Sequence, residues 1–204
     1  MCEVSKQMNC PGCNEVVDRD KLFISAMSVI TKNLFSVTDY LKINGFFTAP
    51  ASTKYHGNYA GGLFDHSLET MNQLVDLSLR NNLKRTRPES PYIVGMFHDL
   101  CKIDAYEYVQ SPAREVTSGI TIQKDDGHWD YNNECLIKGH GDKSVMILST
   151  LMQLTEEEVL CIRYHMGAFV DKDEWNYYTR AIEKYPNVLW THHADMIASR
   201  IVGI

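Results

Sequence analysis

The stretch Gly61-Gly62-Leu63-Phe64-Asp65-His66-Ser67-Leu68 opens the segment that says most about the fold of this 204-residue chain. Apolar residues recur there at three- and four-residue intervals, and this spacing predicts an amphipathic helix over about 63–81. The apolar stripe of that helix consists of Phe64, Leu68, Met71 and Val75. His66 lies about 160° from the centre of the stripe, so we expect its side chain to face solvent or a separate polar cavity.

The same periodicity predicts further helices on both sides of this segment. They are expected over about 20–41, 90–100, 142–153, 156–167, 172–184 and 187–201. Asn44-Gly45 should end the first of them, because glycine suits the left-handed position after a helix. Ser90 should cap the helix that begins with Pro91, and Thr155-Glu156-Glu157-Glu158 predicts a capping box. The expected fold class is therefore mainly α, with a single domain over 19–204.

Residues 106–134 interrupt the helical pattern. Ile120-Thr121-Ile122 and Trp129-Asp130-Tyr131 favour β-structure and lie on either side of Asp126-Gly127, a dipeptide typical of tight hairpin turns. We therefore expect one small β-hairpin inserted into the helical domain.

Residues 1–18 form a separate N-terminal segment in this interpretation. Its Cys10-Pro11-Gly12-Cys13 stretch predicts a tight turn that is half of a zinc site, but no second close pair of Cys or His residues follows. The six cysteines are scattered, and no export signal is recognisable. We therefore expect reduced thiols and a cytoplasmic protein.

The composition is that of a globular domain with an acidic balance. The chain has 26 acidic residues against 20 Lys and Arg, which gives a formal net charge of −6. Proteins that bind long phosphate backbones are usually basic, so this balance favours a small anionic ligand over a polymeric nucleic acid. No apolar run is long enough to span a bilayer, and we expect no membrane partner.

His98, Asp99 and Lys102 can share one face of a helix, because Lys102 follows the other two by four and three positions. An imidazole, a carboxylate and an ammonium group in one place suit a metal ion with a phosphate resting on it. Alone, such a trio is more often an aspartate at a helix end beside an incidental histidine. Further candidates are His66, His140, His165 and Asp195.

Taken in chain order, these residues resemble the ligand set of the HD-domain metallohydrolase superfamily, in its form with five ligand segments and two metal ions. The opening stretch 61–68 resembles the family's GGL-x-(E/D)-H-(S/T)-L. His98-Asp99-Leu100-Cys101-Lys102 resembles HD-(I/L)-G-K, with Cys101 in place of the usual glycine, and His192-His193-Ala194-Asp195 resembles the closing H-x-A-D. The resemblance covers about 45–204 and implies an HD-domain helical bundle.

The resemblance also implies a metal site made of His66, His98, Asp99, His140, His165 and Asp195. In the family two divalent ions are bridged by the residue matched by Asp99 and by a water. Four neutral imidazoles and two carboxylates leave two divalent ions with a net charge of about +2, which attracts phosphate. The bridging water would become hydroxide near neutral pH and attack phosphorus, while Lys102 stabilises the developing charge.

Nitrogen-rich ligation suits Fe, Mn, Co, Ni or Zn better than Mg, and we expect Fe or Mn. Asp99 and Lys102 are thus the expected catalytic residues. Lys102 and His56, which lies ten residues before His66, are the expected substrate contacts. The expected reaction is hydrolysis of a phosphate ester of a nucleotide or a related small phosphorylated metabolite.

Other chemistries remain open from the sequence. Some relatives are phosphodiesterases acting on cyclic dinucleotides or on short RNA or DNA ends. However, Met166-Gly167-Ala168-Phe169 lacks the Gly-Tyr-Pro of the first, and residues 1–45 are too short for the nucleic-acid-binding module of the second. HD-type di-iron oxygenases use a similar ligand set, and a non-catalytic binding module is a third alternative.

Overall fold

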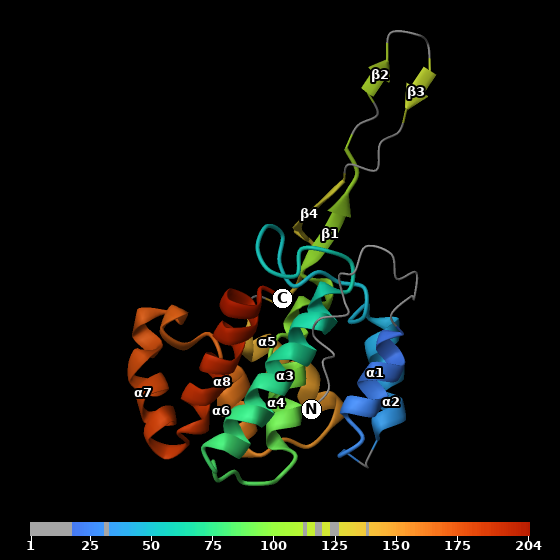
Figure 1. The fold of residues 1–204 in the computed structure, drawn as a ribbon. Coiled ribbons are helices and arrows are strands. Elements are labelled where there is room, and N and C mark those ends of the chain that lie inside the picture. The colour runs from blue at the N-terminus through green and yellow to red at the C-terminus, as the bar shows by residue number, and fades with distance from the viewer. Residues whose placement is uncertain (1–17, 31–32, 112–113, 117–119, 123–126, 138) are drawn as a thin grey trace.

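A computed structural model of the chain describes residues 18–30, 33–111, 114–116, 120–122, 127–137 and 139–204. The described chain is mainly α-helical with a small antiparallel β arm, which confirms the predicted fold class (Figure 1). The α-helices are α1 (Arg19–Ala26), α2 (Leu34–Ile43), α3 (Gly62–Arg80), α4 (Ser90–Phe97), α5 (Gly141–Leu151), α6 (Glu156–Arg163), α7 (Trp175–Lys184) and α8 (Asn187–Met196). Short 3-10 segments are η2 (Leu100–Asp104), η3 (Gly167–Phe169) and η4 (Lys172–Glu174), and η5 (Ile197–Val202) is a π-helix.

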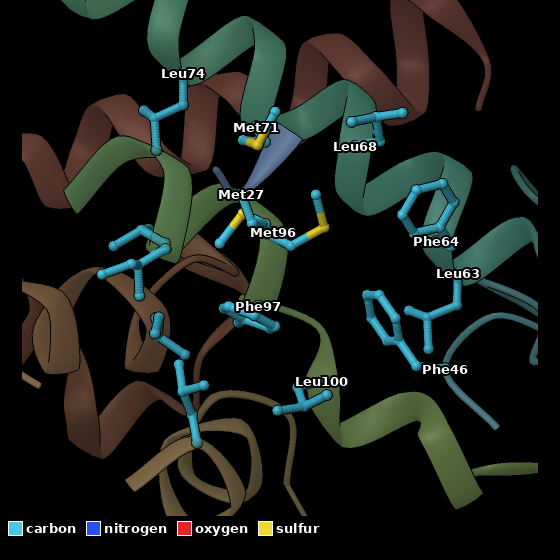
Figure 2. Packing of buried hydrophobic residues seen from close by; sticks show 14 of the residues in the cluster. Met27, Phe46, Leu63, Phe64, Leu68, Met71, Leu74, Met96, Phe97 and Leu100 are labelled. Carbon is cyan, nitrogen blue, oxygen red and sulfur yellow. The ribbon is translucent and has the colours of Figure 1, made fainter. Parts of the chain in front are cut away.

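Helix α3 lies at the centre of the bundle and packs along α4 and α8. The contact with α4 is close, because a Cβ atom at Gly95 would lie 2.4 Å from the Cα atom of Met71. Side chains of both helices, among them Phe64 of α3 and Phe97 of α4, gather in one buried cluster (Figure 2). Each large apolar side chain that is fully buried contributes about 1.5–3 kcal/mol, so this cluster fixes how α3 and α4 are aligned.

The predicted helix over 20–41 is wrong as a single element. The chain forms α1 and α2 instead, and Asn33 immediately before α2 adopts a left-handed conformation with φ 61°. Residues 29–31 are Val, Ile and Thr, a run of β-branched side chains that lowers helix propensity at this point. Phe23 of α1 and Leu41 of α2 are nevertheless buried in the same cluster, so the apolar pattern itself was informative.

Helix ends agree with the sequence at two of three predicted places. Gly45 after α2 has φ 82°, and Thr155 and Glu158 form the expected capping box. The predicted cap at Ser90 is wrong, since Ser90 is the first residue of α4 and its hydroxyl donates to the buried carboxylate of Glu158 at 2.8 Å.

The β arm projects from the helical body (Figure 1). Strand β1 (Tyr106–Val109) pairs antiparallel with β4 (His128–Tyr131), and β2 (Arg114–Val116) pairs with β3 (Ile120–Ile122). The predicted hairpin therefore exists, but its strands pair differently from a hairpin turning at 126–127. Aromatic side chains face each other across β1 and β4, where the rings of Tyr106 and Tyr131 are 5.5 Å apart, and such cross-strand pairs stabilise this pairing.

Residues 1–17, with the predicted Cys10–Cys13 turn, lie outside the described residues. Within the described part, Cys101, Cys135 and Cys161 are free thiols. None of the helices described is both long and apolar enough to traverse a membrane.

Candidate metal centre

Five of the predicted ligands meet at one end of the bundle. His66 belongs to the second turn of α3, His98 and Asp99 directly follow α4, His165 follows α6, and Asp195 lies near the end of α8. His66 Nε2 is 3.2 Å from His98 Nε2 and 3.3 Å from Asp195 Oδ1. Asp99 Oδ2 is 3.5 Å from the Nε2 atoms of both His66 and His98, and Asp99 Oδ1 is 3.3 Å from His165 Nε2. Helices distant in sequence therefore bring these side chains into direct contact.

The three buried imidazoles share one orientation. In each of them Nδ1 faces a main-chain oxygen atom. These Nδ1–oxygen distances are 2.9 Å for His66 to Ile204, 2.9 Å for His98 to Gly95 and 2.7 Å for His165 to Ile162. A main-chain oxygen only accepts, so each Nδ1 carries a proton and each Nε2 is directed at the centre. Histidines that ligate metals usually donate their other ring N–H in this way.

The carboxylate of Asp99 contacts most of the other charged or titratable side chains of the centre. Lys102 Nζ lies 2.6 Å from Asp99 Oδ2, and both side chains are buried. Burial alone would raise the pKa of Asp99, but the charge of Lys102 and the neighbouring histidines hold it well below its usual range. The carboxylate is therefore ionised, as a metal ligand must be.

Two buried atoms at this place lack hydrogen bonds. Asp99 Oδ1 and His165 Nε2 have no hydrogen-bond partner of acceptable geometry within the described chain. A buried polar atom without a partner costs about 1–3 kcal/mol, so the pair fits a further group bound between them. Imidazole nitrogens with carboxylate oxygens are the donors that Mn, Fe, Co, Ni and Zn accept. The residues present therefore fit the predicted ions.

Without metal, protons are shared unequally within the cluster. Burial would lower the pKa of His66, but hydrogen bonds with Asp195 and Asp99 outweigh it and raise that pKa to about 9. Burial lowers the pKa of His98 to about 4. The pKa of Asp195 is lowered, because hydrogen bonding to His66 outweighs burial. In the metal-free protein His66 is thus the cation between two carboxylates, and His98 is neutral.

His140, the sixth predicted ligand, lies at the exposed edge of the centre, directly before α5. It forms a further group of possible ligands with Asp99 and Cys101, whose ligand atoms all lie within 4.8 Å of one another. The distance between Cys101 Sγ and His140 Nδ1 is 3.6 Å. Burial raises the pKa of Cys101 to about 12, so its thiol is protonated. Sequence reasoning did not select Cys101; its only signal was its position between Asp99 and Lys102.

A cavity of about 230 Å³ opens onto the centre. Its walls include Asp99, Lys102, His140 and Asp195, and also the predicted substrate contact His56. The His56 ring lies 4.7 Å from that of His66, and its Nε2 is buried without a hydrogen-bond partner. Burial lowers the pKa of His56 to about 4, so a neutral imidazole faces the cavity region.

The cavity also involves residues that no sequence pattern assigned to the site, namely Tyr131 and Arg200. His192 of the closing motif lines it as well, with its Nδ1 donating to the His165 carbonyl at 2.8 Å. The His192 ring packs on Gly167, where φ is 60° and a Cβ atom would lie 2.8 Å from the ring. Glycine at this position therefore serves both the backbone turn and the place of the imidazole.

Comparisons of the chain with protein-family models, with curated proteins and with solved structures give no significant match. The class of the site consequently rests on its geometry: a buried histidine–aspartate cluster with the donor set of a transition-metal centre, open to a small cavity.

Proposed function

We propose that this chain is a metal-dependent phosphohydrolase of the HD type. The observation that carries the proposal is the shared orientation of His66, His98 and His165, whose Nδ1 atoms are held by main-chain oxygens while their Nε2 atoms face Asp99 and Asp195. Three buried imidazoles in contact with the buried carboxylate of Asp99 and the partly buried one of Asp195 are costly to desolvate. Cations bound among them would offset that cost, and the order of these residues in the chain is that of the HD ligand motif.

The six predicted residues would hold the ions, with His140 contributing from the open side. His98 and Asp99 each belong to two of the three groups of closely spaced donors. Of the two, only Asp99 has a carboxylate, whose two oxygens could serve more than one ion. When bound, such ions supply Lewis acidity toward a phosphoryl oxygen and toward water.

Lys102 supplies the positive charge that the chain itself brings to the phosphate. It lines the cavity beside Asp99, and its pKa is raised, because the Asp99 charge outweighs burial. It therefore stays protonated at any physiological pH and can neutralise charge on the phosphoryl oxygens. His56 would donate or accept a hydrogen bond through its unpartnered Nε2 on the same side.

The size of the cavity favours a small substrate. Its volume of about 230 Å³ is below the roughly 300–1,000 Å³ typical of sites for drug-sized ligands. It would admit the phosphate end of a nucleotide or similar ester and exclude a double-stranded nucleic acid.

The test is phosphate release by the full chain after metal removal and reloading with Mn, Fe, Co, Ni or Mg. The panel contains p-nitrophenyl phosphate and nucleoside mono-, di- and triphosphates. We expect turnover with at least one transition metal, and loss of both turnover and bound metal in Asp99→Ala. Lys102→Met should keep the metal content but lower turnover by about 10²–10³-fold. The matched control is Lys184→Met, because Lys184 is exposed on α7 and pairs with Glu156 far from the cavity.

Three outcomes would reject the proposal. Metal binding with oxygen-dependent turnover and no phosphate release would instead favour a di-iron oxygenase. Full cellular activity in His98→Ala would favour a non-catalytic binding module. Phosphate release that is unchanged in Asp99→Ala would show that the activity does not come from this centre.

A further inference from the structure

The cavity carries a second cation besides Lys102. Arg200 belongs to η5 and lines the same cavity. Lys102 is paired with Asp99, whereas no carboxylate of the described residues lies within ion-pair distance of Arg200. The guanidinium carbon of Arg200 instead lies 5.9 Å from the centroid of the exposed Tyr55 ring. An aromatic face, and not an acid, therefore accompanies this charge.

Arg200 reaches the cavity from the π-helical end of the chain. The cavity wall at this place also includes Asp195, Met196 and Ser199, so α8 and η5 both contribute to it. The wide turn at this end includes a hydrogen bond from Gly203 N to Ala198 O at 2.9 Å. Such wide turns are rare in proteins overall, and those that occur are often found at functional sites.

Two hydroxyl groups that line the cavity are already engaged. Those of Ser52 and Ser199 donate to the carbonyl oxygens of His56 and Asp195, each at 2.8 Å. Arg200 brings several N–H donors and a positive charge to the cavity wall. A guanidinium group binds phosphate or carboxylate through two parallel hydrogen bonds, and a cation–π contact with an aromatic face leaves its N–H edges free.

We propose that Arg200, supported by Tyr55, forms an outer anion subsite that recognises a second phosphate or carboxylate of the substrate. The inference rests on the proposed function and narrows it: the substrate class is a phosphate ester with two anionic groups. The scissile phosphate lies near Asp99 and Lys102, and the second group lies at Arg200.

The experiment compares probes that differ in the second anion. Adenosine 5′-monophosphate is measured beside adenosine 3′,5′-bisphosphate and adenosine 5′-diphosphate, on the metal-loaded wild type and on Arg200→Gln. We expect kcat/KM to favour at least one of the doubly phosphorylated probes, and the variant to reduce that preference about tenfold, mainly through KM. Arg180→Gln is the matched control, since Arg180 stacks on Tyr177 of α7 at 4.7 Å, away from the cavity, and its loss changes the net charge equally.

The outer subsite is overturned if the wild type shows no preference for a doubly phosphorylated probe, or if Arg200→Gln keeps the same preference. Either result leaves the hydrolase proposal intact. If no probe releases phosphate, the hydrolase proposal fails, and equilibrium binding to the metal-free protein still decides the subsite. There, wild type should bind the bisphosphate at least fivefold more tightly than the monophosphate, and Arg200→Gln should remove the difference. Equal affinities in the wild type would refute it.

Discussion

Replacement of Asp99 by asparagine separates the structural from the metal-binding role of the centre. The change keeps the shape of the side chain but removes the charge that pairs with Lys102 at 2.6 Å. Both residues are buried, with 3% and 8% of their surface exposed. Lys102 would then be a buried cation without its counterion.

The expected cost follows from this burial. Breaking a buried ion pair by removing one partner typically costs about 3–5 kcal/mol, because the remaining charge is uncompensated. For a chain of this length that corresponds to a fall in Tm of about 6–20 °C in the metal-free protein. Asp76→Asn is the matched control: it removes the exposed pair with Arg80 on α3, which is worth about 0–1 kcal/mol.

The same variant should also lose stabilisation by metal. A ligand present at 100 times its Kd stabilises the folded state by about 2.7 kcal/mol, so Mn should raise the Tm of the wild type by about 5–11 °C. Differential scanning calorimetry in EDTA and in excess Mn measures both effects. If Asp99→Asn is as stable as the wild type in EDTA, the described Lys102 contact is wrong. If it is still stabilised by Mn to the same extent, Asp99 is no ligand.

Three further outcomes are expected. Glu158→Gln should lower the free energy of unfolding, measured in urea, by about 2–4 kcal/mol. The reason is that this buried carboxylate accepts hydrogen bonds from the side chains of Arg87 and Ser90 and from a main-chain N–H. A loss below about 1 kcal/mol would contradict this expectation. Gly167→Ala should destabilise the protein more than Gly203→Ala in the same urea assay. Both glycines have a positive φ, but only at position 167 would a Cβ atom meet an imidazole ring. Equal losses of stability would refute the steric argument. Metal binding at pH 7 should release protons and become tighter as the pH rises toward 9. The reason is that metal-free His66, with its pKa of about 9, must lose a proton to become a ligand, and the pKa of His165 is raised as well by its hydrogen bond with Asp99. Calorimetric titration in two buffers of different ionisation enthalpy measures the release, and zero release would contradict the expectation.

The sequence indicated which residues come together better than it indicated what surrounds each of them. Periodicity correctly placed His66 away from the apolar stripe of α3, but it left open whether solvent or a polar cavity lay there. The structure buries His66 completely, and one of the groups that contact its ring is the main-chain oxygen of Ile204, 138 positions further along the chain. A helical pattern reports which side of a helix packs on the core, and it contains no information about a distant segment that closes over the other side.

The same limit explains the errors in the fold. Residues 20–41 have the apolar periodicity of one helix, but the chain forms two helices there, with a break before Asn33. Phe23 and Leu41, one from each helix, are still buried in the same core. In the arm, Asp126-Gly127 is a strong local turn signal, but β1 pairs with β4, and the strands β2 and β3 between them in the chain pair with each other. Arg200 could not be assigned to the site either, since it belongs to none of the motifs that selected the other residues.

The imidazoles of His98 and His165 are oriented by the same local hydrogen bond. His98 follows α4 and His165 follows α6, and each donates Nδ1–H to the carbonyl three residues earlier, at the C-terminal end of its own helix. The last carbonyls of a helix lack intrahelical partners, so a histidine there satisfies one of them while its Nε2 is directed onward. The same helix ends carry partial negative charge, which favours cations in front of them. Packing then only has to bring the two ends together at Asp99. An insertion of one residue in α6 would turn His165 by about 100° and take its Nε2 away from Asp99, whatever the stability of the helix.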